Sequence, residues 1–151
     1  MPQSLAQIYI HLVFSTKKRQ RFFQDEVLNE QLRAYLGGTL RELGCPSMGI
    51  GTPEDHIHIL FCLSRTHAIA EVIGQMKSSS SRWMQKQPGG CREFAWQGGY
   101  GAFSVSASGV ENVKTYILNQ VEYHKKVSFQ DEFRLFLKKY NLPYDERYVW
   151  D

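Results

Sequence analysis

The stretch QIYIHLVF (residues 7–14) decides the fold. Aliphatic or aromatic side chains occupy every second position, which predicts a β-strand with one face turned towards a core. That face carries Ile8, Ile10, Leu12 and Phe14. The other face carries Tyr9, His11 and Val13. We therefore expect a strand that buries apolar residues on one side and presents a histidine on the other.

The segments that follow this strand predict one αβ core. Asp25 is a good N-cap for a helix whose leucines recur at helical spacing, and Gly44 and Pro46 should end that helix. The next expected elements are a hairpin of strands at residues 48–52 and 56–63, a helix at residues 67–87 capped by Thr66, and a strand within residues 99–108. The order strand, helix, strand, strand, helix, strand (βαββαβ) predicts an α+β fold with a ferredoxin-like, RRM-like antiparallel sheet.

A helical extension is expected after this core. Ser108 can cap one helix, whose apolar spacing continues to Val121, and a last helix is expected at residues 129–140. We place the αβ core at residues 7–106 and the extension at residues 108–151. The two parts form a single domain over residues 1–151.

The composition agrees with one compact domain. The chain has 151 residues, 42% of them hydrophobic, with 12 glycines and 5 prolines, which excludes a disordered or collagen-like protein. No stretch approaches the roughly 20 apolar residues of a membrane span, so a cytoplasmic protein is expected. Cys45, Cys62 and Cys91 form no CxxC pair and are expected to be reduced thiols. A net charge of +3 and a pI near 8.8 permit a nucleic-acid partner.

The pattern His56-Ile57-His58 is the first candidate for chemistry. Residues two apart in a strand project on the same face, so both imidazoles should point one way. Two neutral imidazoles side by side can bind a divalent metal ion. The alternative is a pair of surface or half-buried histidines without a ligand.

A second candidate lies on the helix after the fourth strand. Tyr116 and Gln120 are four residues apart, so they share a helix face, and Tyr123 and His124 follow one to two turns later. A tyrosine hydroxyl can attack a phosphodiester, and a glutamine carbonyl oxygen can complete a metal site. The alternative is a half-buried tyrosine and an exposed glutamine on an ordinary amphipathic helix.

Basic residues gather in three places and could contact DNA. The candidate contacts are Lys17, Lys18, Arg19 and Arg21 after the first strand, Lys77 and Arg82 beside a run of serines, and Lys125 and Lys126 after the tyrosine helix. Aromatic residues available for base stacking are Trp83, Trp96, Tyr100 and Phe103. The alternative is a set of solvated helix ends and core aromatic residues.

Five segments carry a resemblance to a known family. They are YIHLVFSTKKRQ (residues 9–20), DHIHILF (55–61), KSSSSRW (77–83), FAWQGGYGAFSVS (94–106) and VKTYILNQ (113–120). In this order they resemble the small single-tyrosine HUH transposases of bacterial insertion sequences, the IS200-like transposase family. The resemblance places the metal-binding histidines at His56 and His58, the nucleophile at Tyr116 and a third metal ligand at Gln120.

The resemblance implies a DNA transposase that cleaves and rejoins single-stranded DNA next to subterminal hairpins. Mg²⁺ or Mn²⁺ at the three ligands would polarise the scissile phosphate, which Tyr116 attacks to form a 5′-phosphotyrosine and a free 3′-hydroxyl. Tyr116 is favoured over Tyr123 because Gln120 would hold the metal ion beside it. On one continuous helix the two tyrosines would lie about 10 Å apart along the axis. His11, Tyr123 and His124 are expected to have supporting roles.

The resemblance also implies a homodimer, in which each active site combines the histidines of one subunit with the tyrosine helix of the other. The C-terminal run FRLFLKKYNLPYDERYVW (residues 133–150) supports a dimer, because it has more apolar surface than a small domain readily covers. The alternative is that this run folds back on its own subunit. Two other functions stay open, a His-x-His phosphoesterase and a non-catalytic protein that binds DNA or RNA hairpins.

Overall fold

The computed structural model describes residues 2–88 and 92–151, so Cys91 lies outside the described residues. This part of the chain contains a four-stranded antiparallel sheet in the order β2-β3-β1-β4. The strands are β1 (Tyr9–Ser15), β2 (Ser47–Gly51), β3 (His56–Cys62) and β4 (Gly101–Val105). The strand order and the βαββαβ connectivity confirm the predicted ferredoxin-like sheet.

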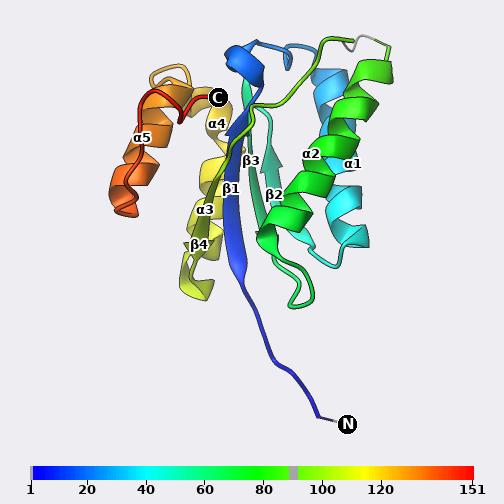
Figure 1. Cartoon of the computed structure of the whole chain (residues 1–151), viewed down its shortest axis with the longest axis vertical. Helices are drawn as coiled ribbons and strands as arrows, with labels where there is room; N and C mark the ends of the chain where they lie inside the picture. The colour runs from blue at the N-terminus through cyan, green and yellow to red at the C-terminus, as the bar shows by residue number, and fades with distance from the viewer. Residues whose placement is uncertain (1, 89–91) are drawn as a thin grey trace.

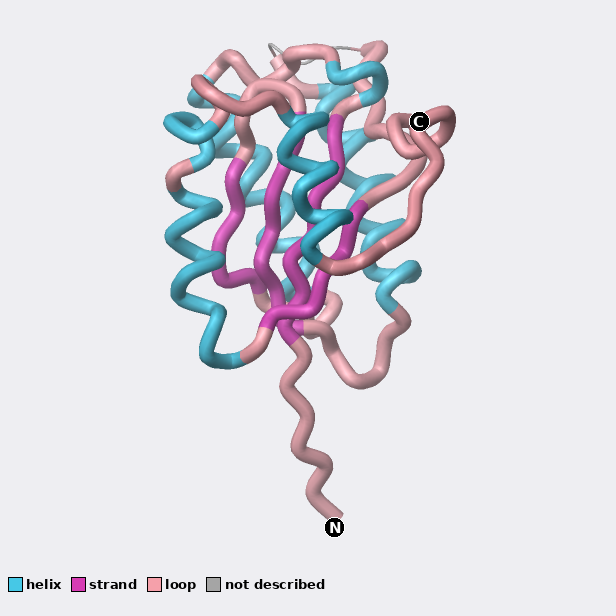
Figure 2. The backbone as a smooth tube through the Cα atoms, turned by 90° about the vertical axis from the view of Figure 1, so that its left-hand side faces the viewer, coloured by secondary structure: helices cyan, strands magenta, loops and turns pink. Residues whose placement is uncertain are grey.

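Helices cover both faces of the sheet, as the two views in Figures 1 and 2 show. One layer consists of α1 (Glu26–Glu42) and α2 (Ile69–Lys86). The other layer consists of α3 (Val110–Leu118), α4 (Gln120–Tyr123) and α5 (Phe129–Lys139). Short 3-10 turns lie at η1 (Lys17–Arg19) and η2 (Ala107–Gly109). Within the described residues, no helix is long and apolar enough to cross a membrane.

The face of β1 predicted to enter the core does so except at Ile8, which precedes the strand and is 45% exposed. Ile10, Leu12 and Phe14 are buried in one hydrophobic cluster with the leucines of α1 and the apolar residues of α2. Asp25 caps α1 by accepting hydrogen bonds from the backbone amides of its first turn. Gly44 follows the end of α1 with a φ of +72°, a conformation that favours glycine.

The C-terminal run folds back on its own sheet. Phe133 and Leu137 of α5 are buried with Val13 and Phe103 of the sheet, and Trp150 packs against the same cluster. Part of the apolar surface that the sequence offered as a reason for a dimer is therefore covered within one chain. Four residues of the same run stay exposed, namely Leu135, Leu142, Tyr144 and Tyr148. The homodimer stays a prediction.

Two glycines allow the second helical layer to lie close to the sheet. A Cβ at Gly51 would stand 2.8 Å from the carbonyl oxygen of Ile117 in α3. A Cβ at Gly101 would stand 2.5 Å from the ring of Phe133 in α5. Both distances are shorter than normal van der Waals contact, so any larger residue would push these helices away from the face that carries the histidines.

The structure corrects two helix boundaries. Ala68, not Thr66, is the N-cap of α2, and Thr66 forms a hydrogen bond with Ser64 in the preceding turn. The predicted helix from Ser108 to Val121 is interrupted at Asn119, whose φ of −97° and ψ of 16° leave the helical range. The interruption lies between Tyr116 and Tyr123.

Candidate active site

Two histidines of β3 lie on the sheet face that α3, α4 and α5 cover. The side chains of His56 and His58 are 1% and 0% exposed, and their ring centroids are 5.1 Å apart. The shared face predicted from their spacing is confirmed. Their burial excludes the alternative of two surface histidines.

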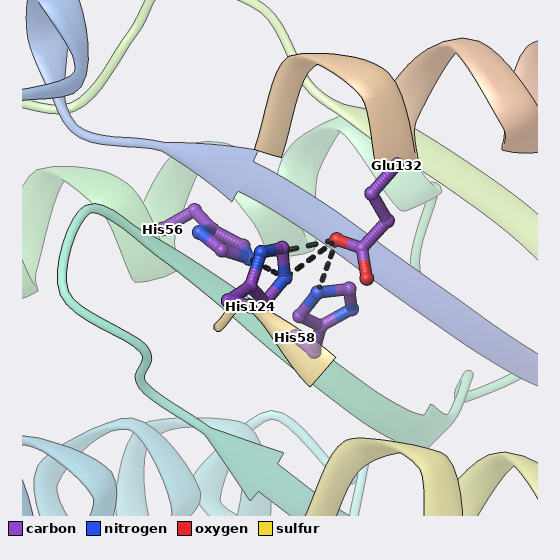
Figure 3. A group of neighbouring side chains, drawn as sticks. All are labelled: His56, His58, His124 and Glu132. Carbon is purple, nitrogen blue, oxygen red and sulfur yellow. Dashed lines mark hydrogen bonds and ion pairs between the residues drawn. The ribbon is translucent and has the colours of Figure 1, made fainter. Parts of the chain in front are cut away.

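Two further side chains close around this pair (Figure 3). Oε1 of Glu132 in α5 lies 2.9 Å from Nε2 of His58, 3.2 Å from Nε2 of His124 and 3.5 Å from Nε2 of His56. Nε2 of His56 and Nε2 of His124 are 3.0 Å apart. The four atoms all lie within 4.8 Å of one another. We refer to His56, His58, His124 and Glu132 as the His/Glu cluster.

Two of the imidazoles are fixed by partners outside the cluster. Nδ1 of His124 lies 2.7 Å from the carbonyl oxygen of Val127, which can only accept a hydrogen bond. Nδ1 of His56 lies 2.7 Å from a carboxylate oxygen of Asp55. Both Nδ1 atoms therefore carry a hydrogen, and in the neutral imidazole the lone pair is left on Nε2. These lone pairs point towards the centre of the cluster.

His11 of β1 lies on the same sheet face, as predicted. Its Nε2 is 2.9 Å from Nδ1 of His58. Burial lowers the pKa of His11 to about 3 and that of His58 to about 4, so both rings are neutral at physiological pH. A contact between two neutral imidazoles fixes the orientation of the His58 ring.

Glu132 is ionised although it is only 1% exposed. Burial by itself would raise its pKa, but hydrogen bonds from His124, His56 and His58 hold the pKa far below its usual range. Burial also opposes the charged form of His56, yet Asp55 and Glu132 outweigh it and raise its pKa. The cluster therefore has a negative charge at its centre that calls for a compensating proton or metal ion.

Tyr116 of α3 reaches the same carboxylate. Its hydroxyl donates a hydrogen bond to Oε2 of Glu132, and its ring meets the His58 ring edge-on with centroids 5.7 Å apart. Burial and the charge of Glu132 raise the pKa of Tyr116, so the phenol is held in its protonated form. The tyrosine and the histidines come together within a single chain.

Tyr123 lies close to Tyr116, with ring centroids 5.3 Å apart. The expected separation of about 10 Å is measured along the helix axis, and two long side chains can meet across such a distance, so that separation stays a prediction. Of the two tyrosines, only Tyr116 donates a hydrogen bond to Glu132 among the described residues.

Gln120 lies beside Tyr116 rather than exposed on the helix. It is 2% exposed, and its amide nitrogen donates to the carbonyl oxygen of Tyr116 at 3.1 Å. Its amide also favours the ionised form of the Tyr116 phenol. Within the described residues, its Oε1 atom is buried and has no hydrogen-bond partner.

Two clefts border the site. One, of about 330 Å³, lies between α3 and α5 and is lined by Tyr116, Glu132 and Lys139 among others. The other, of about 540 Å³, has His56 and His124 in its lining. Arg21, Lys125 and Lys126 line this second cleft, so three of the predicted DNA-contact residues lie next to the cluster.

The comparisons with known proteins agree with this geometry. A sequence model of the family described as "Transposase IS200 like" matches residues 4–120. The chain belongs to the IS200-like transposase family. A protein from Deinococcus radiodurans, assigned as a transposase, is 25% identical with a TM-score of 0.60, over 80% of this chain and 95% of that one.

A second solved structure has the same fold as this IS200-like transposase. It is a REP-associated tyrosine transposase bound to a REP hairpin, 13% identical with a TM-score of 0.59, and the match covers 84% of this chain and 76% of that one. No curated protein sequence matches the chain.

Half of the His/Glu cluster lies outside the family match, which ends at residue 120. The sequence pointed to His124 only as a supporting residue and did not point to Glu132 at all. The available signal was a carboxylate on the apolar stripe of α5, between Phe129 and Phe133. Charged residues on such a stripe are buried only when they have partners.

The other predicted DNA-contact residues of this IS200-like transposase lie away from the cluster. Lys17, Lys18 and Arg19 in η1 line a cleft with Trp96 and Trp150. Lys77 and Arg82 belong to α2, in the layer on the other face of the sheet (Figure 1).

Most of the aromatic residues expected to stack on bases are packed against other residues of the protein. Trp96 and Phe103 are buried in the two cores, and Trp83 stacks on Tyr35 with centroids 5.1 Å apart. Tyr100 alone of the four is exposed. The fold therefore uses three of these rings for its own packing.

Lys77 is a structural residue in this chain. Its Nζ donates to the carbonyl oxygens of Gln97 and Gly99 at 2.8 and 2.7 Å and lies over the ring of Phe14. Burial lowers its pKa to about 8. In the absence of DNA the Lys77 ammonium group ties the loop before β4 to α2, and the expected contact with DNA stays a prediction.

Replacing Lys77 by Met is expected to lower the free energy of unfolding by about 2 kcal/mol, because two carbonyl oxygens lose a charged donor. Urea denaturation measures this. Arg82→Met, in an exposed position of the same helix, is the control and should change the free energy by less than about 0.5 kcal/mol. Unchanged stability together with weaker hairpin binding by Lys77→Met would favour the DNA-contact role.

Proposed function

We propose that this chain cleaves and rejoins single-stranded DNA at the ends of an insertion sequence, through a covalent bond between Tyr116 and a 5′ phosphate. One observation carries the proposal: the Tyr116 hydroxyl and three imidazoles converge on the two oxygens of Glu132. A nucleophile and a set of metal ligands at one point are what phosphoryl transfer to tyrosine requires.

A divalent metal ion, Mg²⁺ or Mn²⁺ in the family's usual chemistry, is the proposed cofactor. His56 and His58 would hold it, since their Nε2 atoms face the centre of the cluster. The resemblance offers Gln120 as the third ligand, and its unpartnered oxygen is compatible with that role. When bound, the ion supplies charge neutralisation and polarises the scissile phosphate.

The chain's own residues position the nucleophile. Glu132 accepts the hydrogen bond of the phenol and thereby orients its oxygen, and the Gln120 amide favours the developing phenolate. In the reaction the Tyr116 oxygen forms a bond to phosphorus while the bond from phosphorus to the 3′ oxygen breaks. The proton lost by the phenol balances the proton gained by the 3′ oxygen. The phosphotyrosine retains the energy of the broken bond, so a later 3′-hydroxyl can rejoin the strand without ATP.

The proposed substrate is single-stranded DNA that carries a hairpin. The REP-associated neighbour is bound to such a hairpin. In this chain, Arg21, Lys125 and Lys126 line the same cleft as His56 and His124. Basic side chains at this position would bind the phosphates that flank the cleavage site.

We further propose that each chain cleaves DNA with its own tyrosine. The resemblance implies a homodimer with composite sites, but here Tyr116 lies against His58 of the same chain. A dimer, where it forms, would then not need to exchange its tyrosine helices. The short distance between Tyr116 and His58 supports a site complete in one chain over a composite site.

The experiment is incubation of the purified protein and Mn²⁺ with labelled single-stranded oligonucleotides that span the imperfect palindromes flanking the gene. A denaturing gel is expected to show a covalent protein–DNA adduct and a free 3′-hydroxyl product. Release of nucleotides without an adduct would instead identify a phosphoesterase. Binding without either product would identify a hairpin-binding protein.

A further inference from the structure

We infer that His124 and Glu132 join His56 and His58 as ligands of one metal ion, and that this set of three nitrogens and one oxygen selects a transition-metal ion over Mg²⁺. The inference deepens the proposed function, because it concerns the metal ion of the same site, which would take the scissile phosphate as a fifth ligand when DNA binds. It replaces Gln120 by two residues that lie beyond the part of the chain matched by the family.

The hydrogen-bond partners of the cluster are the first argument. Val127 and Asp55 fix hydrogens on Nδ1 of His124 and His56, so both neutral rings direct lone pairs from Nε2. These two Nε2 atoms lie 3.0 Å apart and both face a carboxylate oxygen. Three electron-rich atoms at such distances repel one another unless a proton or a metal ion lies between them.

The spacing of the ligand atoms is the second argument. In a tetrahedral site with bonds of about 2.0–2.1 Å to nitrogen, neighbouring ligand atoms are about 3.3 Å apart. Four of the six separations within the cluster are 2.9, 3.0, 3.2 and 3.5 Å, and all six are within 4.8 Å. The four short separations are close to those of a four-coordinate metal site.

The chemistry of the ligands decides the class of ion. Mg²⁺ prefers six oxygen ligands and keeps several waters, which a buried group of three imidazoles does not offer. Imidazole nitrogen suits Zn²⁺, Co²⁺ and related transition-metal ions, and one carboxylate is compatible with them. The same cluster without a metal would instead need a protonated histidine to balance Glu132. A measurement of metal binding distinguishes the metal-bound cluster from the cluster with a protonated histidine.

The experiment titrates metal-free protein with Co²⁺ and records the visible absorption spectrum, without DNA. We expect one equivalent of Co²⁺ to give the intense bands of a tetrahedral complex. Zn²⁺ should displace it stoichiometrically, whereas a large excess of Mg²⁺ should not. Weak bands typical of six-coordinate Co²⁺, or displacement by Mg²⁺, would overturn the inference.

Variants then assign the ligands. Glu132→Gln and His124→Ala should each weaken Co²⁺ binding by at least about a hundredfold, because each removes a ligand. Gln120→Ala should bind Co²⁺ like the wild type. His67→Ala is the matched control, because His67 forms a histidine–carboxylate pair with Glu71 away from the site. Loss of binding in Gln120→Ala, with normal binding in Glu132→Gln, would restore the ligand set implied by the resemblance.

The wild-type spectrum and the competition between metals need no variant, so they decide the inference even where a variant fails to fold. Far-UV circular dichroism shows which variants are folded, and Glu132→Asp provides a second carboxylate variant. Different results would contradict the proposed function and the proposed set of metal ligands. A tetrahedral Co²⁺ spectrum without any DNA adduct would overturn the proposed function alone, and an adduct formed by a protein with six-coordinate Co²⁺ would overturn this inference alone.

Discussion

Tyr116→Phe is expected to remove the covalent protein–DNA adduct, with a loss of cleavage of at least about a thousandfold. The substitution deletes one hydroxyl and keeps the ring that packs edge-on against His58. Glu132 keeps its contacts with three histidines, so no buried charge is left without a partner. The protein should therefore fold normally and bind the hairpin nearly as well as the wild type.

Tyr123→Phe is the matched control for this prediction. Its ring lies 5.3 Å from that of Tyr116, so it is the other tyrosine within reach of the site. This variant should still form the adduct, because its hydroxyl does not contact Glu132 in the described structure. Peptide mapping of the trapped adduct gives the decisive measurement. A phosphotyrosine found at Tyr123 would contradict the assignment.

A mixture of Tyr116→Phe chains and His58→Ala chains is expected to stay inactive, although each chain carries the residue that the other lacks. The reason is that Tyr116 lies beside the histidines of its own chain, so neither chain alone has a complete site. Cleavage of the labelled hairpin by the mixture, after the chains are unfolded and refolded together, measures this.

Composite sites would give a different result. In a one-to-one mixture, half of randomly formed dimers contain both chains, and each of these has one intact composite site, so about a quarter of wild-type sites would be recovered. Recovery near that level would show that the tyrosine helices are exchanged between subunits. Sedimentation of the wild-type protein with and without DNA would then report whether the dimer exists before cleavage.

The sequence by itself determined the sheet and its two faces. The alternation in β1 and the His-x-His spacing in β3 have a period of two, which depends only on the geometry of a single strand. The cap at Asp25 and the helical spacing of the leucines in α1 are equally local. The histidine pair and the tyrosine could therefore be recognised before any tertiary contact was known.

Only the tertiary structure decided how the site is completed. Glu132 lies 74 positions after His58 in the chain, and its contact with that histidine depends on how α5 packs on the sheet. That packing requires the close approach at Gly101 and the burial of Phe133.

The basic residues also show the difference between a local sequence pattern and a tertiary contact. Lys77 and Lys125 look alike in the sequence, since each is a lysine in or beside a helix with polar neighbours. The fold directs the Lys77 ammonium group to two backbone carbonyls and leaves Lys125 in the lining of the cleft that also includes His56 and His124. Local patterns fix which side of an element a residue occupies, but contacts between distant elements depend on packing, which no local pattern contains.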